Sequence, residues 1–159
     1  MQDRLLRVTV VWALAAAWAC QITTDVSKVA RLDVRVVADP DTIAIGDSTL
    51  LVVSATNPTF DTVRFSTGGC GPLGIEIQTV RGEVVVPAAV GCDVGGAGVV
   101  VAPTATIRAS VVWHGERWIG AGSGPPRPLV PGVYRVRGFV NADGRVRFGP
   151  PTPVWLTAP

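Results

Sequence analysis

His114 is the one histidine in the chain, so it is the first residue to test for catalytic chemistry. A histidine acts as a general base when a nucleophile lies within hydrogen-bond reach and a third group orients the ring. Ser123 stands between two glycines and Ser48 stands two residues after Gly46, but neither has the strand–turn–helix pattern of a nucleophile elbow. This spacing favours His114 as an ordinary residue at the end of a strand, and a hydrolase that uses it is the enzymatic alternative. We predict no catalytic residue and expect that the chain is not an enzyme.

Metal and phosphate sites need patterns that this sequence lacks. Cys70, Cys92 and His114 carry the sulfur and nitrogen atoms that zinc prefers, but no C-x-x-C spacing joins them. The glycine-rich residues 91–98 lack the lysine and the following helix of a phosphate-binding loop. We therefore predict no metal and no cofactor.

The first 19 residues have the pattern of a secretory signal peptide. Arg4 and Arg7 precede residues 8–19, which are apolar apart from Thr9. A run of this length is too short to cross a hydrocarbon core of about 30 Å as a helix. We predict a signal peptide over residues 1–19, and a structural N-terminal helix is the alternative.

Cys20 follows the small residue Ala19 at the end of the apolar run, and this arrangement resembles a bacterial lipobox. The resemblance implies cleavage before Cys20 and attachment of diacylglycerol to its thiol. We expect residues 20–30, which are polar and without pattern, to be a tether to that lipid anchor. The expected location is the cell envelope, on the periplasmic or outer face of a membrane, and plain secretion is the alternative.

Charge and cysteine content fit such a compartment. Without residues 1–19, which hold Arg4, Arg7 and Asp3, the 14 basic and 12 acidic residues fall to 12 and 11. No basic block remains, so we expect no binding to nucleic acid. Cys70 and Cys92 are then an even pair in an oxidising compartment, and we predict a disulfide between them. Such a bridge would stabilise the fold by roughly 3 kcal/mol.

Residues 31–159 predict an antiparallel β-sandwich, with a compact barrel as the alternative. Apolar and polar residues alternate over residues 32–36 and 104–113, and residues 49–55 are rich in β-branched side chains. Residues 75–86 predict a hairpin that turns at Arg81 and Gly82. No segment of the mature chain keeps a 3.6-residue apolar period, and turn signals recur about every 8–12 residues between short strands, as is typical of a sandwich.

Residues 131–140 predict a turn followed by a strand. Pro131 and Gly132 are turn residues, and Tyr134, Val136, Gly138 and Val140 then share one face. A tyrosine just after a turn, at the start of a late strand, resembles the tyrosine corner of immunoglobulin-like sandwiches. The resemblance implies a structural role for Tyr134, whose hydroxyl would bond to nearby backbone.

An exposed loop precedes this strand. Trp118 lies in a loop, whereas Trp113 shares the apolar face of its strand and is expected in the core. Arg127 lies among the prolines of residues 125–131, which form either a stiff connector or a polyproline segment for docking. We name Trp118 and Arg127 as residues of a binding loop.

The order of these elements resembles the immunoglobulin-like modules of bacterial envelope lipoproteins. Residues 104–157 are similar in layout to the BsuPI-type proteinase-inhibitor domain: a strand that ends in Trp113, a loop, the segment from Leu129 to Tyr134 that opens a strand, and a terminal hairpin. The resemblance implies a lipid-anchored module that binds another protein or stabilises an envelope assembly. The alternative that it implies is inhibition of a protease through an exposed loop, residues 120–128.

Overall fold

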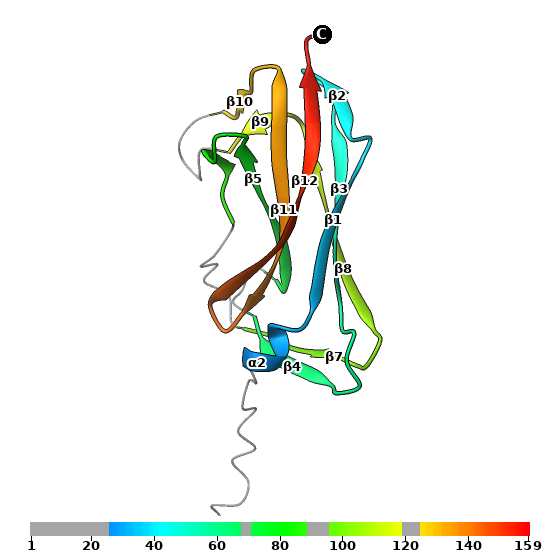
Figure 1. Cartoon of the computed structure of the whole chain (residues 1–159). Coiled ribbons are helices and arrows are strands. Elements are labelled where there is room, and N and C mark those ends of the chain that lie inside the picture. The colour runs from blue at the N-terminus through cyan, green and yellow to red at the C-terminus, as the bar shows by residue number, and fades with distance from the viewer. Residues whose placement is uncertain (1–25, 68–70, 89–95, 119–124) are drawn as a thin grey trace, which may run out of the picture.

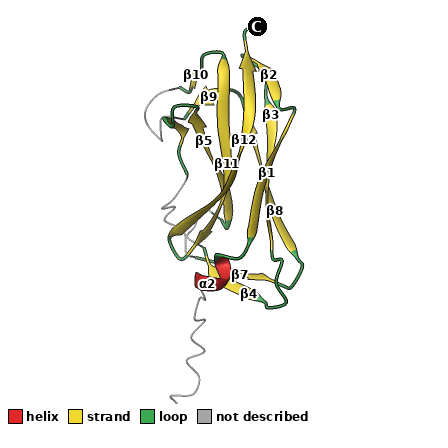
Figure 2. Cartoon of the chain, in the orientation of Figure 1, coloured by secondary structure: helices red, strands yellow, loops and turns green. Residues whose placement is uncertain are grey.

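The computed structural model describes residues 26–67, 71–88, 96–118 and 125–159. Their regular structure is β-strand except for one helical turn, α2 (Val26–Val29), as Figure 2 shows. No helix in these ranges is long and apolar enough to cross a membrane. The predicted signal peptide, Cys20, Cys70 and Cys92 all lie outside the described residues.

A five-stranded sheet forms one layer of the molecule (Figure 1). Its central strand is antiparallel to both neighbours, and the predicted hairpin of residues 75–86 is present as its last two strands. The pairing of the first two strands is parallel. The strand order is β2 (Thr42–Ala44), β12 (Arg145–Thr157), β11 (Gly132–Ala142), β5 (Leu73–Thr79) and β6 (Val84–Val86).

A three-stranded antiparallel sheet packs against the first and completes a sandwich. Its order is β1 (Asp33–Asp39), β3 (Thr49–Thr56) and β8 (Thr106–Trp113). The core lies between the layers because each inner face carries every second residue of its strands. The prediction of an all-β antiparallel sandwich is confirmed. Fully buried side chains from both layers include Leu51, Val53, Ile77, Val136 and Val154.

Gly138 sets how closely the two layers approach. A Cβ atom at this position of β11 would lie 2.8 Å from Val53 Cγ1 and 3.3 Å from the Arg35 carbonyl oxygen. No side chain fits there without a shift of the facing sheet, so the glycine allows the contact between β11 and the β1–β3 pair.

The α2 end of the sandwich is closed by a small sheet of β4 (Val63–Ser66) and β7 (Gly98–Val101). Val29 of α2 is buried there, and Arg147 donates hydrogen bonds to the carbonyl oxygens of Val29 and Leu32. These contacts hold α2 against the end of the sandwich. One buried apolar residue is too weak a pattern to mark this packing in the sequence.

Asn57 joins two loops at the same end. Its side-chain nitrogen donates to the carbonyl oxygens of Asp61, Val101 and Ala102 at 2.7–3.1 Å. Its side-chain oxygen accepts hydrogen bonds from the Thr59 backbone N–H and hydroxyl. A fully buried amide with this many partners fixes the β3–β4 connection against the β7–β8 connection.

Candidate functional site

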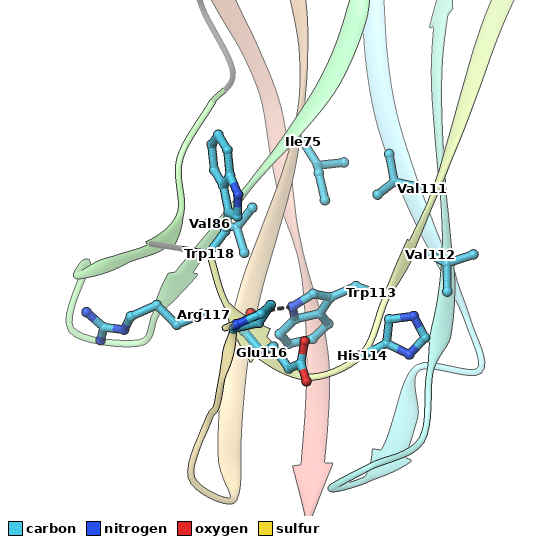
Figure 3. A pocket seen from close by; sticks show the side chains of 10 residues that line it. Ile75, Val86, Val111, Val112, Trp113, His114, Glu116, Arg117 and Trp118 are labelled. Atoms are coloured by element: carbon cyan, nitrogen blue, oxygen red, sulfur yellow. Dashed lines mark hydrogen bonds between the residues drawn. The ribbon is translucent and has the colours of Figure 1, made fainter. Parts of the chain in front are cut away.

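An apolar groove opens along one side of the sandwich, where β8 comes close to the β5–β6 hairpin. It consists of two neighbouring pockets of about 260 and 330 Å³. The two pockets share four apolar side chains in their walls, and we call the region that they form the Trp118 groove (Figure 3). The shared residues are Ile75, Val86, Val111 and Trp118. A groove with such walls can hold apolar side chains of a ligand.

Trp118 is fixed in this groove by a backbone hydrogen bond, although its side chain is exposed. The Trp118 N–H donates to the Val85 carbonyl oxygen at 3.0 Å, yet the residue is 46% exposed. Trp113, in contrast, is buried at the end of β8, and its indole nitrogen donates to the Glu116 carbonyl oxygen at 3.0 Å. Its ring also meets the Tyr134 ring edge-on, with 5.8 Å between the centroids. The two tryptophans therefore divide into a core residue and a surface residue.

His114 lies at the mouth of the groove, exposed to solvent (Figure 3). Within the described part of the chain, no hydrogen bond links its ring to a serine, cysteine or acidic residue. The described residues also contain no group of three or more His, Cys, Asp or Glu side chains that could hold a metal ion.

A short ribbon forms the boundary between the groove and a second pocket. Its strands are β9 (Glu116–Arg117) and β10 (Arg127–Pro128), and Arg117 lies directly opposite Arg127. The pocket beyond it has a volume of about 450 Å³ and is lined by both arginines, Glu83, Leu129 and Tyr134, among others. We call it the arginine pocket.

Tyr134 forms part of the wall of the arginine pocket. Its hydroxyl donates a hydrogen bond to the Val130 carbonyl oxygen at 2.8 Å, four residues back toward the turn. Burial raises the pKa of Tyr134 above its usual 10.0, the positive charge of Arg117 lowers that pKa, and the negative charge of Glu83 raises it. Both charged groups are thus close enough to the hydroxyl to act on it.

Of the residues predicted for a site, Trp118 and Arg127 lie at neighbouring pockets, and Tyr134 lines the same pocket as Arg127. Sequence reasoning missed Arg117, Glu83 and the β9–β10 ribbon. Two-residue strands carry no readable alternation. The one available signal in the sequence was Gly115, a turn residue just before Glu116. In the structure, Gly115 has a positive φ of 68°, and its carbonyl oxygen accepts a hydrogen bond from the Leu129 N–H.

Comparison with known proteins gives similarity of fold but no family. No family model matches the chain, and no curated protein matches it. The DNA glycosylase AlkC of Pseudomonas fluorescens is 11% identical with a TM-score of 0.47, over 80% of this chain and 31% of that one. A β-glucosidase of Erythrobacter marinus is 12% identical with a TM-score of 0.45, over 79% and 16%. The CARDB domain of protein PF1109 of Pyrococcus furiosus is 14% identical with a TM-score of 0.42, over 79% and 87%.

These similarities contradict the prediction that the chain is not an enzyme. That prediction came from missing catalytic motifs, yet solved chains with a similar part belong to a DNA glycosylase and to β-glucosidases. The chain spans less than a third of those enzymes, and likenesses at these TM-scores assign no activity to it. What stands is a β-rich fold with a CARDB domain among the similar structures.

Proposed function

We propose that this chain is the β-sandwich binding module of a cell-envelope lipoprotein, and that it holds an extended segment of a partner protein in the Trp118 groove. The observation that carries the proposal is the exposed indole of Trp118 beside an edge of β8 that pairs with no other described strand. The resemblance of the sequence to immunoglobulin-like envelope modules supports the same reading.

The edge beside the groove belongs to β8. Among the described strands, β8 pairs only with β3, so its other edge presents backbone N–H and C=O groups without a strand partner. Val111 and Val112 near the end of β8 are 40% and 54% exposed. An extended peptide can add to such an edge through its backbone and place alternate side chains in an adjacent pocket.

The position of the groove fits attachment at the other end. Residue 26 enters the sandwich at α2, whereas β9 and β10 lie at the opposite end (Figure 1). A chain anchored through Cys20 would reach the domain from the α2 end. The groove would then be directed away from the membrane and toward a partner.

The anchor is tested by fractionation of cells that express the chain or its Cys20→Ala variant. The proposal expects the unaltered chain with the membranes and the variant in the soluble fraction, because the variant has no thiol to acylate. An identical soluble distribution of both forms would refute the lipid anchor.

The groove is tested with a photo-crosslinking amino acid at position 112 of β8. We expect a crosslinked partner that persists in the Trp155→Ala variant and is lost in Trp118→Ala. Trp155 is a matched control because it is 41% exposed on β12, in the five-stranded sheet. Equal crosslinking in both variants would exclude the groove as the docking site.

A protease inhibitor of the BsuPI type is the second candidate function, and the observation that favours it is the exposure of Arg127. This arginine lies in an extended segment between Pro126 and Pro128, all of them exposed. An extended, proline-stiffened arginine has the shape of a substrate for proteases with an acidic specificity pocket. Assay against a panel of serine and metalloproteases decides, because the absence of inhibition throughout the panel would remove this function.

A further inference from the structure

The arginine pocket contains more positive than negative charge. Arg117 and Arg127 both line it, and Glu83 is the one acidic residue in its wall. Glu83 pairs with Arg117 at 2.6 Å, with the two side chains 59% and 37% exposed. In the described part of the chain, Arg127 has no carboxylate within ion-pair distance.

The register of the β9–β10 ribbon brings the two arginines together. Arg117 and Arg127 are direct cross-strand partners, and side chains at such positions lie on the same face about 5 Å apart at Cβ. Like charges placed directly opposite each other destabilise a strand pair. A second carboxylate between the two guanidinium groups would remove this repulsion.

The existing ion pair leaves donors available for such a carboxylate. A guanidinium group has five N–H donors, and the Arg117 side chain uses one of its terminal nitrogens on Glu83. An exposed ion pair of this kind contributes little stability, so it does not lock Arg117 in place. Two guanidinium groups can bind one carboxylate with short, charge-assisted hydrogen bonds.

The wall beneath the arginines is already hydrogen-bonded. The Tyr134 hydroxyl donates to the Val130 carbonyl oxygen, and the Thr79 hydroxyl accepts the Glu83 backbone N–H at 3.2 Å. Leu129 and Val85 are buried beside them. The two arginines are therefore the groups that would bind an anion in this pocket, while the rest of the wall gives it shape.

Arg117 also connects this pocket with the apolar groove, because it lines both. Figure 3 shows its side chain leaving the groove, with the guanidinium group on the side away from His114. The next residue is Trp118. A segment in the groove can therefore place an apolar side chain against Trp118 and its neighbour at the arginine pocket.

We propose that Arg117 and Arg127 form a carboxylate-binding site, and that the partner segment fills it with an acidic side chain next to an apolar residue bound at Trp118. The partner part of this inference rests on the proposed function. The carboxylate site itself depends only on the two arginines and the pocket.

The site is tested by titration of the isotope-labelled intact chain with N-acetyl-glutamate α-amide, which carries one side-chain carboxylate, and, as a control, with N-acetyl-glutamine α-amide, which carries none. Resonances of the arginine Nε–H groups are followed at low ionic strength, where screening is weak. We expect saturable shifts of Arg117 and Arg127 with the carboxylate probe alone, and an affinity about tenfold lower in the Arg127→Gln variant. Shifts that are linear and equal to those of exposed Arg64 would overturn the site.

The second part of the test measures crosslinking to the partner in arginine variants. Arg127→Gln should weaken crosslinking from position 112 several-fold, and Arg64→Gln, on the distant β4, should leave it unchanged. A saturable carboxylate site with no crosslinked partner would refute the docking function and keep the site. A partner that depends on Trp118 but not on Arg127, without a saturable carboxylate shift, would refute the carboxylate inference and keep the docking function.

Discussion

The two ends of the sandwich differ in the burial and hydrogen bonding of their polar side chains. At the α2 end, Asn57 is fully buried and its amide group makes five hydrogen bonds within the fold. At the β9–β10 end, Arg117 and Arg127 are direct cross-strand partners, and Glu83, which pairs with Arg117, is the one acidic residue in the wall of the pocket that they line. The first end uses its polar groups to hold loops together, and the second leaves donors for a ligand.

This difference separates residues that stabilise the fold from surface residues that are available to bind a ligand. A buried group with its partners inside the fold is costly to remove, because its partners are left without hydrogen bonds. An exposed group with unused donors costs little to remove and affects binding instead. The variants below should therefore fall into two classes, from large losses of stability to none.

The largest effect is expected at Asn57. Asn57→Ala leaves three buried or half-buried carbonyl oxygens without their donor, and we expect the free energy of unfolding to fall by about 2–4 kcal/mol. Chemical denaturation with far-ultraviolet circular dichroism measures it. Asn141→Ala is the matched control, since the Asn141 side-chain oxygen has no partner in the described structure and should cost less. Equal losses would undo the distinction between the two buried amides.

Gly138→Ala should follow, with a loss of about 1–3 kcal/mol. The added methyl group would overlap Val53 and push the two sheets apart. Gly98→Ala on β7 adds the same group where no atom lies within 4 Å, and its effect should be small. Thermal unfolding of both variants checks the prediction, and a Gly138 variant as stable as the Gly98 variant would contradict the close packing.

Tyr134→Phe should lower the free energy of unfolding by about 1 kcal/mol, because the Val130 carbonyl oxygen loses its donor. Tyr134 is at the boundary of the two classes, since it is buried but lines the arginine pocket. An unchanged midpoint of urea unfolding would show that the bond to Val130 adds nothing to stability.

The same residue predicts a pH dependence. The folded-state pKa of Tyr134 is raised above 10.0, so the folded form favours the neutral phenol. This stabilisation is complete below pH 10 and is lost as the pH rises from there through the folded-state pKa. The chain has one tyrosine, so ultraviolet absorbance of the phenolate reports this group alone. A transition at or below pH 10 in the folded chain would contradict the effect of burial.

Arg127→Gln should have the smallest effect on stability, a change within about 0.5 kcal/mol, since the residue is exposed and unpaired among the described residues. Relief of its repulsion with Arg117 acts in the opposite direction and keeps the change small. The measurement is the midpoint of urea unfolding beside that of Arg64→Gln. A loss above 1 kcal/mol would place Arg127 with the residues that maintain the fold.

The sequence predicted best the strands in which apolar residues that face the core alternate with polar residues. Tyr134, Val136 and Val140 of β11 are buried as their spacing requires. The long strand β12 could not be read, since Pro151 and Pro153 mark breaks in a strand pattern. The N–H of Trp155 points toward Asp41 and β2, so the N–H groups missing at these prolines, two and four residues earlier, would face the same side. β2 pairs with β12 only at Trp155–Thr157, so no described strand bonds to this side of β12 at either proline.

The candidate site could be predicted in part. An exposed Trp118 follows from its loop context, and the buried Trp113 follows from its strand face. The meeting of Arg117 with Arg127 depends on a two-stranded ribbon whose strands are ten residues apart in sequence, and Glu83 joins them from the β5–β6 turn. Such a pocket is a product of tertiary contacts, and no local pattern encodes it.

Hydrogen exchange of β8 in the partner complex is the most direct test of the docking function. If an extended partner segment adds to the free edge of β8, amides of Thr106–Trp113 should exchange more slowly in the complex than in the free chain. The strands at the α2 end, β4 and β7, should be unchanged. Exchange of β8 that is identical in the two states would contradict the addition of a partner segment to this edge.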